Sequence, residues 1–283
     1  NRLFNPACDL IPTDEIRVHR WSYQGTQLDV SEQVSDSIQD IIEKGITDSY
    51  SKIGILVRNN LSLEFLEQKL KVPFRIFDED PLAVRNTRIT NFFASLLRYR
   101  FNTDYRINDV IETVERYLRV QEKQVPNLRR LIADVKSKSF EELAESNIII
   151  SENIFNCVIS DSDKRLINSI CVDSKLLKHY MPINENEVQV MTLHKSKGLE
   201  FDVVYHLDLY DWVHPKRLVV HGSWDIHYDN WEQELNLHFV GITRAKEHCI
   251  LVTSSNRLNY QRQVKNGNPS QFFDLPGLDG LYK

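Results

Sequence analysis

"VQVMTLHKSKGLEFDVVYHLDL" (residues 188–209) contains two short apolar runs, 188–193 and 202–209, on either side of a polar loop. Runs of this length and composition are typical of strands buried in a parallel sheet. A loop that leaves such a strand lies at the carboxyl edge of the sheet, where α/β proteins bind their ligands. The lysines and hydroxyls of this loop, with Gly198 to turn the backbone, are typical of a polyanion site. A solvated polar loop without a ligand is the alternative interpretation.

Strand and helix patterns alternate along much of the remaining chain. Four more segments are predicted to be strands: 15–23, which alternates and is expected at a sheet edge, 52–57, 73–78 and 249–254. Three segments have helical patterns: 30–45, ending at Gly45, 62–71, with Ser62 as N-cap, and the first part of 231–255, an amphipathic helix with Leu235, Phe239 and Ile242 on one face that feeds the strand 249–254. This alternation indicates βαβ units, so the predicted fold class is α/β, a parallel sheet with helices on both faces.

One long segment, 101–183, interrupts the alternation. Its pattern is almost entirely helical, with Asn, Asp and Ser punctuation and no convincing buried strand. We therefore expect a small α-helical insertion in one α/β domain. The predicted boundaries are 1–100 for the first part of that domain, 101–183 for the insertion and 184–283 for the remainder.

Composition limits the function classes. The 283 residues are 41% hydrophobic and 27% charged, as in ordinary globular proteins, and no apolar run is long enough to cross a membrane. The net charge of -5 argues against a wholly basic nucleic-acid coat but leaves room for a local basic groove. Four cysteines without C-x-x-C spacing indicate reduced thiols and a cytoplasmic protein. No G-x-x-x-x-G-K-[ST] motif is present, so a nucleotide site here lacks a Walker A loop.

Two arginines lie where predicted elements end. Arg58 follows the strand 52–57, and Arg244 lies at the C-terminal end of the amphipathic helix in 231–255. A guanidinium held on a rigid element suits a phosphate, because its planar fork donates two parallel hydrogen bonds. For Arg244 a structural role is the alternative: it would cap the last carbonyls of its helix or pair with Glu247.

Three segments together resemble one family. "GILVRNN", "VQVMTLHKSKGLEFDVVY" and "FVGITRAKE", in this order, are similar to motifs IV, V and VI of superfamily 1A DNA helicases of the UvrD/Rep/PcrA type. The resemblance implies that the α/β domain is the second RecA-like domain of such a helicase and that the insertion is its 2B domain. The first RecA-like domain, with the Walker motifs, is then expected upstream of Asn1 and is itself a partner of this chain.

The resemblance also implies roles for individual residues. Arg58 and Arg244 match the catalytic arginines that reach the γ-phosphate of ATP. Glu200 and Gly198 match the part of motif V at the nucleotide. The single-stranded DNA contacts carry over to three residues of the same loop: Thr192, His194 and Lys197. ATP and Mg²⁺ are the expected cofactors, held mainly by the first RecA-like domain.

The function that the resemblance implies is an ATP-dependent helicase or translocase on single-stranded DNA, with 3′ to 5′ polarity. The chain alone is expected to be inactive, because it lacks a phosphate cradle. A weaker resemblance to helicase subunits of Gabija-type anti-phage systems leaves a second hypothesis, a helicase-like module that docks a partner nuclease. DNA repair and anti-phage defence are the two expected settings.

The segment between motifs V and VI departs from the family, since it is rich in Trp and His. The spacing of His206, His214, His221 and His227 is too irregular for a metal signature, so no metal site is predicted, and these histidines are expected in solvated or partner-contacting loops. Three tryptophans are expected on the surface as anchors for a protein partner: Trp212, Trp224 and Trp231. Val57 replaces the motif IV tyrosine that stacks on the base.

Overall fold

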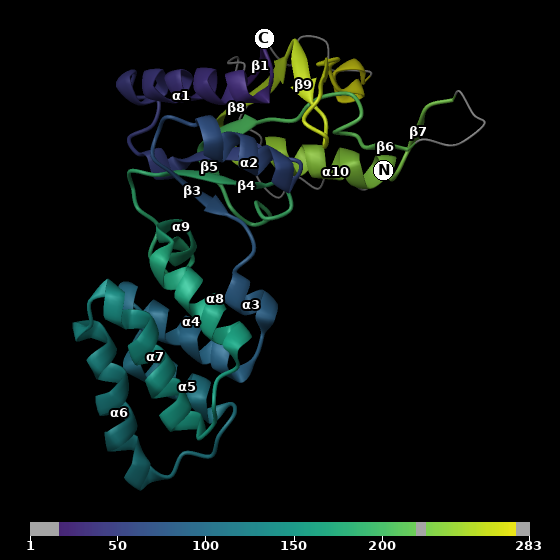
Figure 1. Ribbon diagram of the computed structural model, residues 1–283. Coiled ribbons are helices and arrows are strands. Elements are labelled where there is room, and N and C mark those ends of the chain that lie inside the picture. The colour runs from purple at the N-terminus through teal and green to yellow at the C-terminus, as the bar shows by residue number, and fades with distance from the viewer. Residues whose placement is uncertain (1–16, 219–224, 276–283) are drawn as a thin grey trace, which may run out of the picture. The chain divides into compact units, whose positions relative to one another are not determined.

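The computed structural model describes residues 17–218 and 225–275 and divides the chain into two compact units. The first is an α/β unit made of residues up to Ile76 and from Glu185 onward, and the second is a helical unit over Phe77–Asn184. Figure 1 shows the elements of each unit. Within the described ranges, none of the helices has the length and apolar character needed to cross a membrane.

A six-stranded sheet forms the centre of the α/β unit, in the order β1-β8-β5-β2-β4-β3. Four neighbouring pairs run parallel: β1 with β8, β8 with β5, β5 with β2, and β2 with β4. The strands are β1 Val18–Tyr23, β2 Ile53–Val57, β3 Phe74–Phe77, β4 Val188–Thr192, β5 Phe201–His206 and β8 Ala245–Ser254. All six predicted strands are present, and the alternating one, β1, lies at an edge. The predicted α/β fold with a parallel sheet is confirmed.

Helices cover both faces of this sheet. Because strand side chains alternate in direction, Ile55 and Tyr205 face one side, where α1 (Gln27–Glu43) and α2 (Asn60–Lys69) join them in one apolar core. His206 faces the other side, where α10 (Trp231–Ile242) packs. The two-stranded sheets of this unit are β6 Arg217–Leu218 with β7 His227–Tyr228, and β9 Asn256–Leu258 with β10 Val264–Asn266.

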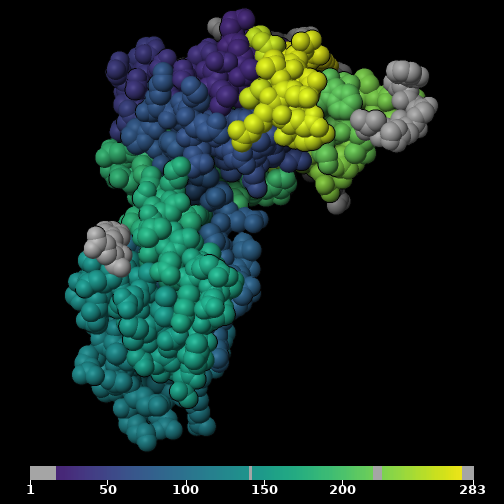
Figure 2. Space-filling view, viewed as in Figure 1, coloured from purple at the N-terminus to yellow at the C-terminus, as the bar shows by residue number. Residues whose placement is uncertain are grey.

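Helix ends in the α/β unit are set by local hydrogen bonds. Gly45 follows the end of α1 with φ +66°, and its N–H donates to Ile42 O, as predicted for a C-terminal glycine. The N-cap of α2 is Asn59, whose Oδ1 accepts the N–H of Ser62 at 3.1 Å, so the prediction of Ser62 as the cap was wrong. Near the amino end of α1, the β9–β10 segment packs beside it, and the two adjoin in yellow and purple in Figure 2.

The buried face of α10 differs from the prediction. Phe239 is 44% exposed, and Leu235 and Ile242 are only partly buried. Instead α10 buries four other residues: Glu234, Leu237, His238 and Gly241. A Cβ at Gly241 would lie 2.7 Å from side-chain atoms of Leu193 and His206, so only glycine lets α10 pack this closely on the sheet.

The helical unit contains seven α-helices among its described residues. They are α3 Pro81–Arg85, α4 Arg88–Phe101, α5 Ile107–Glu115, α6 Val125–Asp134, α7 Phe140–Phe155, α8 Asp161–Val172 and α9 Ser174–Leu177. Short 3₁₀ turns join some of them: Glu122–Gln124, Val135–Ser137 and Lys178–Tyr180. Two more such turns, Tyr50–Lys52 and Gln271–Asp274, belong to the α/β unit.

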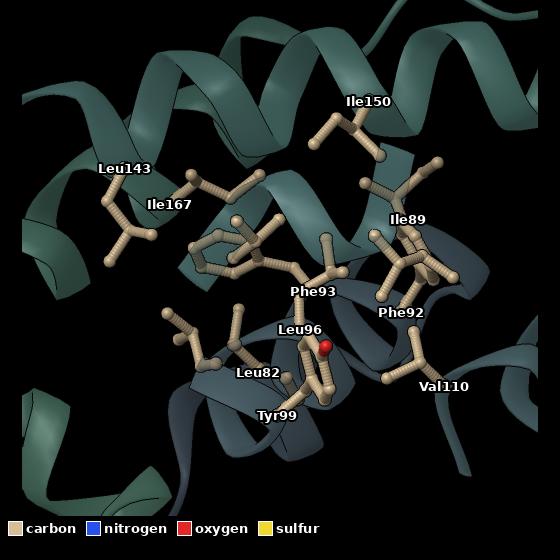
Figure 3. Packing of buried hydrophobic residues seen from close by; sticks show 14 of the residues in the cluster. Leu82, Ile89, Phe92, Phe93, Leu96, Tyr99, Val110, Leu143, Ile150 and Ile167 are labelled. Atoms are coloured by element: carbon tan, nitrogen blue, oxygen red, sulfur yellow. The ribbon is translucent and has the colours of Figure 1, made fainter. Parts of the chain in front are cut away.

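A single apolar core holds the helical unit together (Figure 3). Phe92, Phe93, Leu96 and Leu97 of α4 are all fully buried in it. For this reason the unit begins at Phe77, whereas the sequence placed the start of the insertion at residue 101. The helical pattern of α4 was visible in the sequence, but an amphipathic pattern does not reveal which core a helix joins.

Candidate functional site

The first part of the site is built where β2 and β4 end side by side. Val57 pairs with Thr192, and the N–H of Leu193 donates to Val57 O at 2.9 Å. Arg58 and His194 therefore leave the same edge of the sheet from adjacent strands. The sheet topology thus brings the motif IV arginine beside the beginning of the motif V loop, as parallel strands with a shared carboxyl edge require.

A buried serine fixes the shape of the motif V loop. The N–H of Ser196 donates to Thr192 O at 3.2 Å, and its Oγ donates to Leu193 O at 2.8 Å, with the side chain fully buried. Gly198 then turns the chain with φ +82°, in the left-handed region that favours glycine. Because Ser196 points inward, His194 and Lys197 on either side of it are exposed.

His194 and Lys197 share a pocket with α10. Its other lining residues are Gln233, Asn236, Leu237 and Val240. Partial desolvation, then the nearby charges of Arg58 and Lys197, lower the pKa of His194. At neutral pH the imidazole is therefore uncharged, and Lys197 is the cation of the pair. A phosphate at this pocket would meet one ammonium group and one neutral ring.

Arg58 is held in an ion pair with α10. Its Nε donates to Glu234 Oε2 at 3.0 Å, its Nη2 donates to Glu234 Oε1, and its backbone N–H donates to Asp208 Oδ2 at 2.8 Å. Burial opposes ionisation of Glu234, but hydrogen bonds from His214 and Arg58 and the charge of Arg58 prevail and lower its pKa to about 2. The carboxylate is ionised and meets the guanidinium through two hydrogen bonds.

Arg244 is held by uncharged groups. Its Nε donates to Val240 O at 3.1 Å, its Nη1 to Leu199 O at 2.9 Å and its Nη2 to Thr243 Oγ1 at 3.2 Å. The contact with Val240 is the helix-capping arrangement that the sequence allowed, whereas Glu247 pairs with Arg17 at 3.4 Å. The contact with Leu199 is different, because it joins the arginine to the motif V loop.

The predicted site residues lie along α10 and not at one point. Glu234, the partner of Arg58, is in the first turn of the helix, whereas Arg244 bonds its last turn. Ile242 lies eight positions after Glu234, about 12 Å along the helix at the helical rise. Glu200 is exposed and its carboxylate lies 3.6 Å from Lys246 Nζ, near the Arg244 end.

Sequence reasoning missed the buried polar groups under α10. His206 and His214 are fully buried, so the expectation that they lie in solvated or partner-contacting loops was wrong. His214 Nδ1 lies 2.7 Å from Glu234 Oε2, and His238 of α10 completes a cluster with them. An acid in the first turn of a helix is too common a signal to single out Glu234.

The tryptophans that were predicted to anchor a partner differ in how exposed they are. Trp212 is 44% exposed, and the guanidinium of Arg217 lies 5.4 Å from its ring centroid. Trp231 is partly buried, with ring centroids 4.8 Å from Tyr228 and 5.3 Å from Phe272. Trp224 and His221 lie outside the described residues.

Comparisons with known proteins identify the family. Residues 87–256, well over half of the chain, match the family model described as UvrD-like helicase C-terminal domain. The chain is 29% identical over 195 residues to the ATP-dependent DNA helicase Rep of Buchnera aphidicola subsp. Baizongia pistaciae, covering 62% of this chain and 28% of that protein. With Rep of Escherichia coli it shares 37% identity over 99 residues, 35% of this chain and 14% of that protein.

A third relative is the Gabija protein GajB of Bacillus cereus, 21% identical over 219 residues, which cover 76% of this chain and 40% of GajB. The chain spans well under half the length of each of these three relatives. The resemblance drawn from motifs IV, V and VI is confirmed by the family match, which includes the motif V loop and Arg244. The chain therefore belongs to the UvrD-like helicase C-terminal domain family.

Proposed function

We propose that this chain is the carboxyl-terminal motor portion of an ATP-dependent helicase or translocase that moves 3′ to 5′ on single-stranded DNA in the cytoplasm. One observation carries the proposal: the motif V loop lies between the two arginine-bearing elements. Thr192 at its start pairs beside Val57 and Arg58, and Leu199 near its end accepts a hydrogen bond from Arg244. A movement of either arginine would therefore be transmitted to the loop through these two contacts.

On the nucleotide side, Arg58 and Arg244 would stabilise charge on the transferring γ-phosphoryl group. Arginines in this role contribute on the order of 10³–10⁵-fold to turnover. Arg244 Nη1 already donates to Leu199 O, so turning the guanidinium toward a phosphate would exchange this hydrogen bond for one to the phosphate. That exchange of partners would couple the nucleotide state to the loop.

On the DNA side, Thr192, His194 and Lys197 would contact the phosphate backbone. Lys197 supplies the positive charge, while His194, uncharged at neutral pH, offers a ring nitrogen as hydrogen-bond donor. Movement of Leu199 would shift Lys197 through Gly198, whose turn directly follows the lysine. A step along the strand would result from that shift.

The remaining nucleotide contacts belong to a partner domain in this proposal. Glu200 would approach the ribose of the nucleotide and Gly198 would supply the turn beside it, whereas the triphosphate and Mg²⁺ need the Walker loop that this sequence lacks. The partner is the protein's own first RecA-like domain. The purified 283-residue chain should accordingly show no DNA-dependent ATP hydrolysis, and measurable turnover would contradict the assignment.

The deciding experiment compares Lys197→Ala and His194→Ala in the protein that joins this chain to its ATP-binding domain. We expect both variants to lose DNA stimulation of ATP hydrolysis. At pH 7.5 only Lys197→Ala should also reduce the salt dependence of DNA binding, by about one unit of slope in log Kd against log salt. Lys44→Ala, at the C-cap of α1, is the matched control, since Lys44 is an exposed lysine that contacts Asp40. Unchanged DNA stimulation in both loop variants would reject the assignment of this loop.

A second candidate function rests on the similarity to GajB, which extends over 76% of this chain. In this alternative the chain is a docking module that binds and regulates a partner nuclease in anti-phage defence. Trp212, an exposed indole, would be part of the contact surface. Trp212→Ala should then reduce co-purification with the nuclease while ATP hydrolysis is unchanged; the motor proposal expects no role for this residue in a nuclease contact.

A further inference from the structure

Three histidines meet beneath α10, although they are far apart in the sequence. His206 ends β5, His214 belongs to the loop that follows it, and His238 lies on the buried face of α10. One ring nitrogen of each lies within 4.8 Å of one from each of the others. All three side chains are buried, so their polar atoms must be satisfied within the protein or by a bound group.

Hydrogen bonds fix the tautomer of His206. Its Nδ1 lies 3.1 Å from Leu207 O, and a carbonyl oxygen only accepts, so Nδ1 carries the proton. The side chain is fully buried, and with the proton on Nδ1 its Nε2 carries a free lone pair. His238 Nδ1 lies 3.1 Å from this Nε2 and donates to it.

His214 leaves a buried nitrogen without a partner. Its Nδ1 donates to the ionised Glu234 Oε2 at 2.7 Å, which places the lone pair on Nε2. That Nε2 is buried and makes no hydrogen bond. An unsatisfied buried nitrogen costs about 1–3 kcal/mol, and such an atom in a native protein calls for an explanation.

We propose that His206, His214 and His238 form a binding site for one divalent transition metal ion of the zinc class. Neutral imidazole nitrogens are the ligands that zinc and its neighbours in the series bind well. In a tetrahedral zinc site the ligand nitrogens are roughly 3.3 Å apart, given metal–nitrogen distances of 2.0–2.1 Å. The 3.1 Å between His206 and His238 is already close to that spacing.

The surroundings of the cluster fit a metal site. The hydrogen bond between His214 and Glu234 is the carboxylate–histidine contact that orients a ligating imidazole and fixes its tautomer. Leu207 O has the same relation to His206. Metal binding requires that His238 move the proton of its Nδ1, which now donates to His206 Nε2, to its own Nε2. Gly241 leaves the space, since a Cβ there would lie 2.9 Å from His206 Nε2.

The site would act on the motif IV arginine through one carboxylate. The metal would fix the ring of His214, the ring would hold Glu234, and Glu234 holds Arg58. The ion would also tie α10 to β5 at the centre of the α/β unit. The expected role of the ion is therefore to stabilise the α/β unit and to position Arg58, because its ligand nitrogens are buried away from any substrate.

The test measures metal in the untagged 283-residue chain. Elemental analysis after purification without chelator should find one zinc-class ion per chain. After removal of the ion with a chelator, added Co²⁺ should give the visible absorption of a tetrahedral cobalt site with nitrogen ligands at one equivalent. Added Zn²⁺ should raise the Tm in proportion to the logarithm of its concentration.

His214→Gln and His238→Gln should abolish the cobalt absorption, whereas His227→Gln, an exposed histidine outside the cluster, should leave it unchanged. If the cluster variants fail to fold, the wild-type measurements decide alone. A wild-type chain with neither bound metal, nor a cobalt spectrum, nor a Zn²⁺-dependent Tm would overturn the proposal and leave a hydrogen-bonded chain of imidazoles. A cobalt spectrum that survives in both folded variants would also overturn it.

Discussion

The two ends of α10 each hold an arginine, and they hold it by different means. At the first turn, Arg58 forms a bidentate ion pair with the buried, ionised Glu234, which also accepts a hydrogen bond from His214. At the last turn, Arg244 meets two backbone carbonyls and the hydroxyl of Thr243. Both guanidinium groups are charged donors, but only Arg58 faces an ionised carboxylate that accepts two of its hydrogen bonds, so the first arginine is held more firmly than the second.

This difference assigns the two arginines different parts in the proposed motor. Releasing Arg58 would leave Glu234 buried with only His214 as partner, whereas releasing Arg244 leaves carbonyls that water can reach near the exposed Leu199. Arg244 is therefore the residue that can change partners readily. Arg58 is the fixed reference, and in the metal proposal its position is further set by the imidazole cluster.

The largest expected effect is on ATP turnover, when Arg244 at the last turn of α10 is changed. In the protein that carries the ATP-binding domain, Arg244→Ala should lower kcat by on the order of 10³-fold while ATP binding stays nearly intact. Arg244→Lys should recover little of this loss, because it keeps the charge but not the planar fork. Steady-state ATP hydrolysis on single-stranded DNA measures both.

If Arg244 only caps its helix, Arg244→Ala should instead cost about 1 kcal/mol of stability and leave kcat near the wild-type value. That outcome would reduce the two ends of α10 to structural contacts of different strength.

The next effect is on the stability of the fold, when the ion pair at the first turn of α10 is removed. Glu234→Gln removes the charge that Arg58 and His214 both contact, and it should lower the free energy of unfolding by about 2–3 kcal/mol. Glu232→Gln is the matched control, since Glu232 is an exposed acid of the same turn and should change stability by less than about 0.5 kcal/mol. Urea unfolding of the 283-residue chain gives both values; equal values would show that the ion pair does not anchor this end.

The sequence predicted the contacts at the last turn of α10, near Arg244, better than those at its first turn, near Glu234. Arg244, Gly198 and the strands that carry them follow local rules: a buried run of β-branched residues, a polar loop and a turning glycine. Glu234 and His238 do not, because polar residues at helical spacing normally indicate a solvated face. Leu235 and Phe239 offered the apolar stripe, so the periodicity selected the wrong side of the helix.

The wrong side was selected because the polar residues satisfy one another only in the folded chain. Glu234 contacts Arg58, which follows β2 and lies 176 positions earlier, and His238 contacts His206 across 32 positions of sequence. Such long-range partners remove the cost of burial, and no local pattern records them. The same limit applies to the insertion boundary, since α4 shows its periodicity but not which core it joins.

A smaller effect is expected where α10 packs on the sheet. Gly241→Ala gains about 1 kcal/mol in helix propensity, but its Cβ would lie 2.7 Å from Leu193 and His206. Overpacking of this kind costs about 1–3 kcal/mol, so we expect a net loss of up to about 2 kcal/mol. Urea unfolding measures it. A stabilised variant would show that α10 moves away easily and that its two ends are not rigidly connected.

The smallest expected effect tests the link between Arg244 and the DNA loop. Gly198 has φ +82°, and a Cβ there meets nothing within 4 Å, so Gly198→Ala incurs only the conformational cost of the left-handed region, about 1 kcal/mol. Because this turn lies between Lys197 and Leu199, relaxing it should move the carbonyl that Arg244 binds.

We therefore expect Gly198→Ala to reduce DNA stimulation of ATP hydrolysis, the ratio of the rates with and without DNA, by several-fold. Gly45→Ala is the matched control: Gly45 also has positive φ, +66°, with nothing within 4 Å of its Cβ, but it ends α1 on the opposite face of the sheet. Both variants should lose similar stability in urea unfolding, yet only Gly198→Ala should lose coupling. Equal coupling in the two variants would show that the hydrogen bond from Arg244 to Leu199 holds the loop without transmitting anything through it.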